Sequence, residues 1–314
     1  MLLTFFIFYD IIYDRGDIMK KGDTGKLVKI AQYIIGYTKD LGIFTKALED
    51  KVVSFQKLNG LKPNGAIDND TFYELISSAP IAKKSKIKKN INRAWQLMIE
   101  ANCDGIFGNE TLAKTKEFQS KNGLAADGEV GLKTWCKALS LKKPKYTVKQ
   151  PVNYKQIDKK WKDIVYTYNG TYSKKQTIGN SGCGPTSMAD VIATYWDDKI
   201  TPVETCKSAV ENYFRRKTGG TDGKFFTFMA EKYDGSCLET TSHTYAKEAV
   251  NKGNLVIVSV GKSRWTNGRH YIILWKVSGS TCYINDPYSY SSYKEKAPWN
   301  TLKKARKKYY IIYK

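Results

Sequence analysis

The sequence predicts two all-α modules of three helices each, followed by an α+β domain. Its 314 residues exceed what one hydrophobic core usually fills, since domains typically span about 50 to 200 residues. An internal repeat occupies the first half, and short aromatic and β-branched runs replace the helical patterns after about residue 152. A hydrophobic fraction of 41% excludes an intrinsically disordered chain.

The first 18 residues stand apart from the repeat. They are apolar for roughly a dozen residues, but no basic region precedes them and no small-residue cleavage site follows them. The stretch carries Asp10 and is too short to cross a bilayer. Because Met19 is followed at once by a helical pattern, we expect residues 1–18 to be a loosely attached tail or a wrongly chosen start. No other segment predicts a membrane span.

The repeat has an offset of 63 residues, because the sequence GIF at 42–44 recurs at 105–107. Phe55-Gln56 and Phe118-Gln119 keep the same offset. In each copy a helical pattern leads to GIF, a second helix ends at FQ-x-x-NGL, and a third helix follows a glycine turn. Thr71 and Thr134 predict the N-caps of the third helices. We therefore expect modules at residues 19–80 and 81–140.

The second copy resembles the peptidoglycan-binding module of bacterial and phage wall hydrolases. The motif is D-G-x-F-G-x-x-T, followed by FQ-x-x-x-GL-x-x-DG-x-x-G-x-x-T-W, and its residues run from Asp104 to Trp135. The first copy departs from the motif at Leu41, Thr45, Leu48 and Phe72. The resemblance implies peptidoglycan as a partner, although ligand binding by the degenerate first module does not follow from it.

Residues 141–152, LKKPKYTVKQPV, place two prolines among lysines and predict a linker to a third domain at 153–314. In that domain a glycine-rich turn, TIGNSG, delivers Cys183 to the start of an apolar helical segment. A helix N-terminus lowers the pKa of a cysteine and favours the nucleophilic thiolate. The glycines beside Cys183 leave room for a substrate, so this position favours a nucleophile over an inert buried thiol.

A thiolate nucleophile needs a general base, and the chain has only two histidines. His270 begins the strand-like run HYIILWKV, whereas His243 precedes a short helix and is the weaker candidate. A hairpin centred near residue 278 would set His270 almost opposite Asp286, where the carboxylate could orient the imidazole. Asn285 would then point to the other face. A strand-end aspartate before Pro287 is the structural alternative for Asp286.

The ordered motifs S-GCGPTS, GRHY-I-I and Y-x-NDP resemble the papain-like C39 cysteine peptidases, particularly their wall-hydrolase relatives. This resemblance covers roughly residues 153–313 and implies an α+β papain-like fold, attack by Cys183 and proton transfer through His270. It also implies a glutamine about six residues before the cysteine as an oxyanion donor. Thr177 occupies that position, so Gln176, Asn180 or the backbone N–H of Cys183 is the candidate donor.

Charge and residue counts narrow the ligands and partners. A net charge of +22 attracts polyanions, among them teichoic acid and other anionic wall polymers. The sequence contains no recognisable nucleic-acid-binding motif. Six cysteines form no C-x-x-C pair, and two histidines exclude a multi-histidine metal site. We therefore expect no metal, no cofactor, no nucleic acid and no membrane partner. The sequence does not indicate an oligomeric state.

These features together predict a peptidoglycan hydrolase, an endolysin of a phage or an autolysin, that cleaves an amide bond in the peptide part of the wall. Without a signal peptide, it would be made in the host cytoplasm and act at the cell wall. Two alternatives stay open: a wall-binding protein with an inactive peptidase fold, and a peptidase that processes leader peptides. Neither the scissile bond nor the module ligands follow from the sequence.

Overall fold

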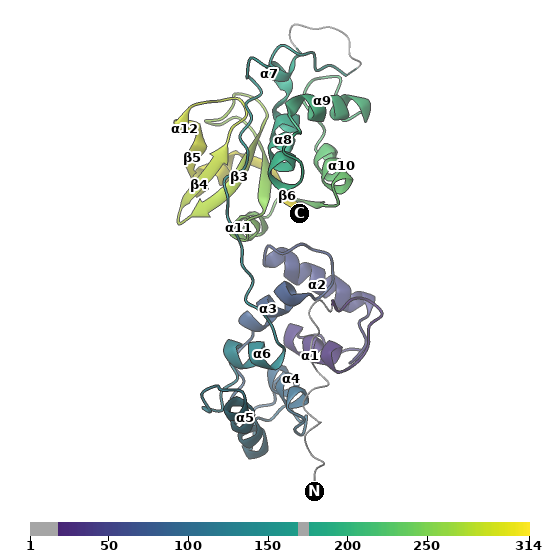
Figure 1. Ribbon diagram of the computed structural model, residues 1–314, viewed down its shortest axis with the longest axis vertical. Coiled ribbons are helices and arrows are strands. Elements are labelled where there is room, and N and C mark those ends of the chain that lie inside the picture. Colours follow the sequence, from purple (N-terminus) through teal and green to yellow (C-terminus); the bar gives the residue numbers. More distant parts are fainter. Residues whose placement is uncertain (1–17, 169–175) are drawn as a thin grey trace. The chain divides into compact units, whose positions relative to one another are not determined.

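The computed structural model describes residues 18–168 and 176–314, so the predicted tail lies outside the described residues except for Ile18. The chain divides into two compact units, with the boundary between Lys145 and Tyr146 (Figure 1). This boundary falls within residues 141–152, the predicted linker. No helix of the described residues is long and apolar enough to cross a membrane.

The first unit is entirely helical, as predicted, with three helices from each copy of the repeat. The helices are α1 (Lys26–Ile35), α2 (Lys46–Leu58), α3 (Asn69–Ser77), α4 (Asn90–Met98), α5 (Asn109–Lys121) and α6 (Leu132–Ala138). Helix α1 packs on α4, and the two copies share one hydrophobic core. Trp95 of α4 lies in T-shaped contact with Trp135 of α6 at 5.0 Å between ring centroids. The repeats therefore form one folding unit.

Four buried glutamines organise the loops of this unit. Each side chain accepts a hydrogen bond from a glycine N–H nine or ten residues later and donates to carbonyl or side-chain oxygens of the same loop. The glutamine–glycine pairs are Gln32–Gly42, Gln56–Gly65, Gln96–Gly105 and Gln119–Gly128. All four glycines have φ between 75° and 87°, a conformation that favours glycine. We call each of these arrangements a glutamine clasp.

The clasps explain both the repeated motif and its degenerate copy. In the complete clasps of Gln56, Gln96 and Gln119, the amide also donates to the carboxamide oxygen of an asparagine or the carboxylate oxygen of an aspartate, and to a threonine hydroxyl. Gln32 lacks both partners and donates to the carbonyls of Lys39 and Asp40 instead. The motif's aspartate and threonine are thus structural in this unit, and their loss in the first copy changes only one loop.

The predicted N-caps of the third helices are each wrong by three residues. Asp68 caps α3 by accepting a hydrogen bond from the N–H of Thr71 at 2.8 Å, and Gly131 precedes α6. Thr71 and Thr134 lie inside their helices, where their hydroxyls accept from the clasp glutamines. Thr71 and Thr134 therefore do lie in the first turn of their helices, but their side chains form part of the glutamine clasps and do not cap the helices.

Replacing Gln119 with leucine is expected to lower the free energy of unfolding by about 2–3 kcal/mol, because the buried N–H of Gly128 and the carbonyl of Glu129 lose their partner. Urea unfolding of the full chain, followed by helical ellipticity, measures the change. Ser120→Ala on the exposed side of the same helix is the matched control and should stay within about 0.5 kcal/mol. Equal midpoints for the two variants would contradict a stabilising clasp.

The second unit contains one antiparallel sheet of six strands in the order β1-β6-β2-β3-β4-β5. The strands are β1 (Ser236–Thr240), β2 (Leu255–Val260), β3 (His270–Ser278), β4 (Thr281–Asn285), β5 (Lys296–Pro298) and β6 (Arg306–Tyr313). The helices are α7 (Ile178–Ser181), α8 (Cys183–Tyr195), α9 (Pro202–Glu211), α10 (Lys224–Lys232), α11 (His243–Asn251), α12 (Ser292–Glu295) and α13 (Trp299–Ala305). This is the expected α+β layout.

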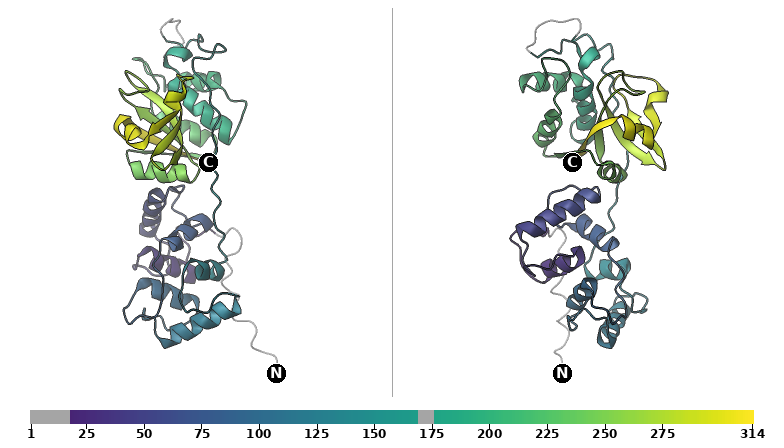
Figure 2. Two further views of the ribbon diagram at one scale, coloured as in Figure 1. Left: turned by 90° about the vertical axis from the view of Figure 1, so that its left-hand side faces the viewer. Right: turned by 180° about the vertical axis from the view of Figure 1, so that it is seen from behind.

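Alternation along the strands gives the sheet two buried faces. Ile257 and Ile273 pack in one core with residues of α8, α9 and α10, which lie together on one side of the sheet in both views of Figure 2. Val258 and Ile272 pack in a second core with residues of α11 and α13. The sheet is therefore covered on both sides. The N-terminus of α8, which carries Cys183, lies against the start of β3.

The hairpin of β3 and β4 has a different register from the predicted one. Ser278 opposes Thr281 across a two-residue Gly279-Ser280 turn, and a bulge falls between Leu274 and Lys276. Ile273 consequently opposes Asn285, which displaces Asp286 from the position directly opposite His270. The hairpin turn lies further along the chain than assumed, and no local pattern announced the bulge.

Candidate active site

Cys183 is the first residue of α8 and follows the short helix α7 after Gly182. A side chain at Gly182 would come within 2.6 Å of the carbonyl oxygen of Ile178, so only glycine fits between the two helices. A side chain at Gly184 would meet Thr221 and Tyr271 at 3.2 Å. The glycines therefore allow α8 to begin close to α7 and to β3, with the thiol between them.

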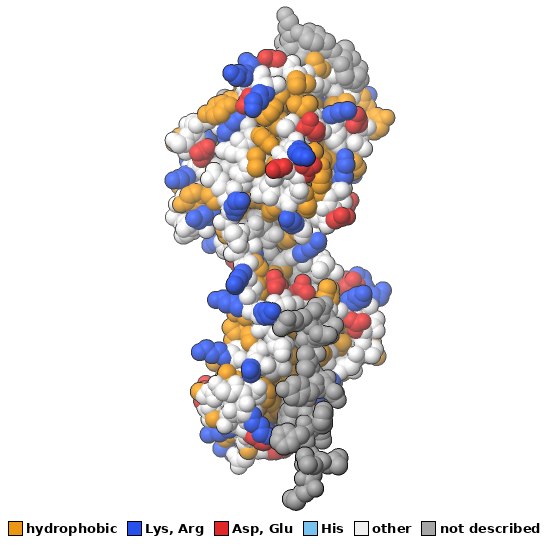
Figure 3. Space-filling model, in the orientation of Figure 1, with side chains coloured by type: hydrophobic (Ala, Val, Ile, Leu, Met, Phe, Trp, Pro, Cys, Tyr) orange, Lys and Arg blue, Asp and Glu red, His pale blue; other side chains and the backbone are white. Residues whose placement is uncertain are grey.

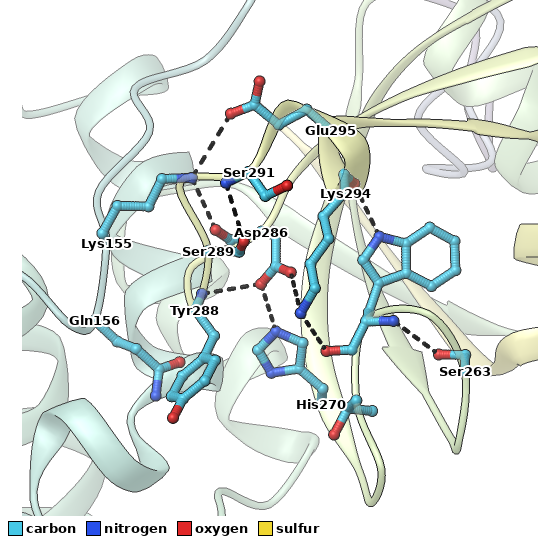
Figure 4. A network of polar contacts seen from close by, with 12 residues as sticks. Lys155, Gln156, Ser263, His270, Asp286, Tyr288, Ser289, Ser291, Lys294 and Glu295 are labelled. Atoms are coloured by element: carbon cyan, nitrogen blue, oxygen red, sulfur yellow. Dashed lines mark hydrogen bonds and ion pairs between the residues drawn. The ribbon is translucent and has the colours of Figure 1, made fainter.

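His270 begins β3, and its imidazole is bonded to Asp286 just after β4 (Figure 4). The Nε2–H of His270 donates to Oδ1 of Asp286 at 2.7 Å, and the two side chains are 7% and 0% exposed. The backbone N–H of Tyr288 donates to the same carboxylate oxygen at 2.9 Å. Although the register differs from the prediction, the structure brings His270 and Asp286 together.

Two lysines hold the aspartate's loop in place. Lys155 Nζ donates to the backbone carbonyl of Asp286 at 2.8 Å, and Lys294 Nζ lies 3.8 Å from its Oδ2. Lys294 also donates to the carbonyl of Trp265, whose indole N–H donates back to the carbonyl of Lys294. Figure 4 shows Lys155 and Lys294 approaching Asp286 from separate segments. A buried carboxylate is thus offset by nearby cations, as its burial requires.

The thiol and the imidazole shift each other's pKa. Burial would raise the pKa of Cys183, but a hydrogen bond and the charge of His270, with hydrogen bonds from the backbone of Tyr271 and Gly184, lower it below its ordinary value. Burial would lower the pKa of His270, but hydrogen bonds to Asp286 and Cys183 raise it to about 9. Because Nε2 serves Asp286, Nδ1 is the nitrogen that faces Cys183. The arrangement favours a thiolate–imidazolium pair.

Cys183 opens on a cavity of about 1040 Å³ between the helical side of the unit and the end of the sheet. Its walls include Asn180 and Ser181 beside the thiol, the loop around Gly220, and residues of β2, β3 and β6. Tyr271 and Tyr288 flank His270 on the cavity surface. A reactive thiol, a proton carrier and room for an extended chain therefore meet at one place.

The two candidate oxyanion side chains lie in different surroundings. Gln176 does not line the cavity, and its Oε1 accepts a hydrogen bond from Arg215 at 3.2 Å. Asn180 does line the cavity, three residues before Cys183. The geometry therefore disfavours Gln176, because its side chain belongs to the buried Arg215 network.

Gln156, which no sequence pattern marks as a site residue, lines the cavity and is 2% exposed. Its amide nitrogen donates to the carbonyls of Gly179 at 2.8 Å and Ile178 at 3.3 Å, which positions the carboxamide beside α7. No local pattern links Gln156 to Cys183 across 26 intervening residues. The only available signal was a count, because just three glutamines, at positions 150, 156 and 176, lie between residue 141 and the cysteine.

His243 has a structural environment away from the cavity. Its Nδ1 lies 2.9 Å from the hydroxyl of Tyr309, and its Nε2 lies 3.1 Å from the guanidinium of Arg306. Since arginine can only donate, Nε2 accepts and the ring is neutral. Burial and the charge of Arg306 lower the pKa of His243. This histidine is not placed to act on Cys183.

Comparison with known proteins gives the family. Residues 153–314, half of the chain, match the model of the Peptidase C39-like family. The chain belongs to the C39-like peptidase family. Residues 26–75 and 86–137 each match the model described as a putative peptidoglycan-binding domain, so the C39-like domain follows two repeats of that family.

The chain is also similar to a solved structure described as a putative C39-like peptidase from Bacillus anthracis. That structure is 16% identical, with a TM-score of 0.33, and the match covers 42% of this chain and 88% of the other. No curated protein matches the chain. Within the described residues, no group of three His, Cys, Asp or Glu side chains could hold a metal ion.

Selective alkylation is expected at Cys183. It is the only one of the six cysteines whose pKa is lowered, whereas burial raises the pKa of the others, to about 12 for Cys237 and Cys282. At about pH 7, iodoacetamide should modify Cys183 at least about tenfold faster than the half-buried Cys103 and Cys136, because the thiolate reacts. This selectivity should shrink as pH rises above about 9 and the other thiols ionise. Peptide mass analysis measures each rate, and faster labelling of Cys103 would contradict a thiolate at Cys183.

Proposed function

We propose that this protein is a peptidoglycan hydrolase that cuts an amide bond in the peptide part of the cell wall. One observation carries the proposal: the Cys183 thiol, with its lowered pKa, shares a hydrogen bond with an imidazole that a buried carboxylate orients. The family supplies the peptidase class, and the two peptidoglycan-binding repeats supply the wall as a partner. A tethered enzyme suits an immobile polymer, because binding raises its local concentration at the bond.

The mechanism begins with attack of the Cys183 thiolate on the amide carbonyl carbon, which places a negative charge on the carbonyl oxygen. His270, as imidazolium, then gives its proton to the amide nitrogen, the C–N bond breaks, and the amine leaves. Neutral His270 next takes a proton from water, whose oxygen attacks the thioester and releases the carboxylic acid and the thiolate. Asp286 orients the ring by accepting from Nε2–H, so that Nδ1 handles the proton.

The oxyanion needs donors close to the thiol. The backbone N–H of Cys183 at the start of α8 is one candidate, and the side chains of Asn180 and Gln156 in the cavity wall are the others. The carboxamide nitrogen of Gln156 donates to the carbonyls of Gly179 at 2.8 Å and Ile178 at 3.3 Å, so donation to the oxyanion requires the longer bond to be released. We assign Gln156 an oxyanion role in place of Gln176, one of the candidates that the sequence offered beside Asn180 and the backbone N–H of Cys183.

The charge of the chain supports recruitment to anionic wall polymers such as teichoic acid. Lysine and arginine side chains are scattered over both units on the face that Figure 3 shows, and they do not gather in one patch. With a net charge of +22, such a distribution attracts a polyanion over long range without defining a single site. We infer that the chain is a phage endolysin made in the host cytoplasm, and that this long-range attraction helps it to reach the wall.

The direct test treats purified Gram-positive walls with the full chain and with Cys183→Ala as the matched control. The proposal expects loss of turbidity with the full chain alone, and mass analysis should find new peptide amine ends without new reducing sugar ends. The position of the new amine identifies the bond. If both proteins sediment with walls and neither clears walls of several types, the chain is a wall-binding protein and the hydrolase is wrong.

A further inference from the structure

Apart from the Cys183–His270 pair, the charged side chains that line the cavity are all positive. Five cations line it, and no aspartate or glutamate of the described residues is among the lining side chains. The cations are Arg216, Arg269, Lys294, Lys307 and Lys308. Low-dielectric walls focus the field of such a group into the cavity, where it attracts anions more strongly than the same charges on an open surface.

Three of the five cations already have acidic partners. Arg216 is bonded to Asp222 at 2.8 Å, Lys308 is paired with Glu239, and Lys294 lies beside Asp286. Within residues 18–168 and 176–314, Arg269 and Lys307 form no ion pair. Two cations in the cavity wall are therefore available to a ligand.

The backbone brings these two cations to the same end of the sheet. Arg269 immediately precedes His270, the first residue of β3, and His270 pairs with Val260 of β2. Val260 pairs on its other side with Arg306, the residue before Lys307. Gly261, which follows β2, has no side chain in the way, since a Cβ there would come within 2.7 Å of Lys307 Cε. The stem of Lys307 thus crosses the end of β2, which separates its own strand from β3.

We propose that the cavity selects a peptide that carries free carboxylates, and that Arg269 and Lys307 bind one of them beside the scissile amide. This inference rests on the proposed hydrolase and names its substrate class. In the wall, it favours a bond in or next to a stem peptide with free carboxylates over an uncharged cross-bridge. A guanidinium bonds a carboxylate through two parallel N–H donors, and an ammonium adds a point charge, so the pair suits one carboxylate group.

The test compares two synthetic stem peptides that differ only by a carboxylate in one and a carboxamide in the other. The full chain should cleave the carboxylate peptide with a kcat/KM at least about tenfold higher, as expected for a charge-assisted contact. The double variant Arg269→Gln, Lys307→Gln should bring the ratio close to one. Lys304→Gln, an exposed lysine of α13 that does not line the cavity, is the matched control and should keep the ratio.

A binding measurement separates failure of this inference from failure of the hydrolase. Cys183→Ala should bind the carboxylate peptide more tightly than the carboxamide peptide by calorimetry, and the difference should shrink between about 50 mM and 300 mM salt. Equal kcat/KM values and equal affinities for the two peptides would overturn the carboxylate preference alone. If neither peptide nor any wall is cleaved, the proposed hydrolase falls, and the substrate class falls with it.

Discussion

Cys183→Ala is expected to lower kcat by about six orders of magnitude, the loss seen when a nucleophile that acts as a unit with its base is removed. None of the other five cysteines lines the cavity, so no second thiol can take the place of Cys183 as the nucleophile. The side chain of Cys183 contributes little to the hydrophobic cores, so the fold should persist. Release of peptide amine ends from walls, measured over hours, gives the residual rate.

Cys136→Ala is the matched control for this substitution. Cys136 is a half-buried thiol of α6 in the first unit, and its loss should change wall clearance less than about twofold while costing at most about 1 kcal/mol of stability. Equal rates for Cys183→Ala and the unsubstituted chain would remove Cys183 from the mechanism. Equal loss in both variants would indicate damage to the fold.

His270→Ala is expected to lower kcat by about 10⁴, because one side chain carries the proton in both halves of the reaction. It should also change the thiol. The hydrogen bond and charge of His270 are what hold the pKa of Cys183 below its ordinary value against burial, so their removal should raise that pKa. The alkylation rate of Cys183 at about pH 7 should then fall at least about tenfold and recover as pH rises.

His243→Ala provides the comparison, since the chain has only these two histidines. His243 contacts Tyr309 and Arg306 outside the cavity, so its removal should leave the alkylation profile of Cys183 unchanged. The pH profile of Cys183 labelling reports the chemical role once the helical ellipticity of His270→Ala matches that of the unsubstituted chain, because unfolding would also return the thiol pKa to its ordinary value. An unmoved profile in His270→Ala would contradict the thiolate–imidazolium pair.

The sequence was sufficient for the order of modules and for the meeting of His270 with Asp286, because both depend on short-range patterns. Periodicity and glycine turns mark helices, and a strand that turns back returns its end to its own start. The exact register was out of reach, since it depends on a bulge near Trp275 that only packing decides. Asp286 still meets His270, because the contact uses the far ring nitrogen of the imidazole, which reaches a diagonal neighbour.

Contacts between distant segments explain what the sequence left hidden. Gln156 enters the cavity from a segment before α7, and only the folded chain places it there. The roles of the four repeated glutamines were equally hidden, because each stands among apolar residues of a helical pattern. In the structure each Gln is buried and polar, which periodicity arguments do not foresee.

The glutamine clasps have a consequence for how such repeats diverge. Each clasp closes between residues nine or ten positions apart, so its geometry is specified by one short stretch of chain. The clasp at Gln32 accommodates one additional residue and lost partners, yet the glycine contact persists at 2.7 Å. Surface positions outside the clasps are therefore free to drift, and a duplicated copy can acquire a different ligand while inheriting the same frame.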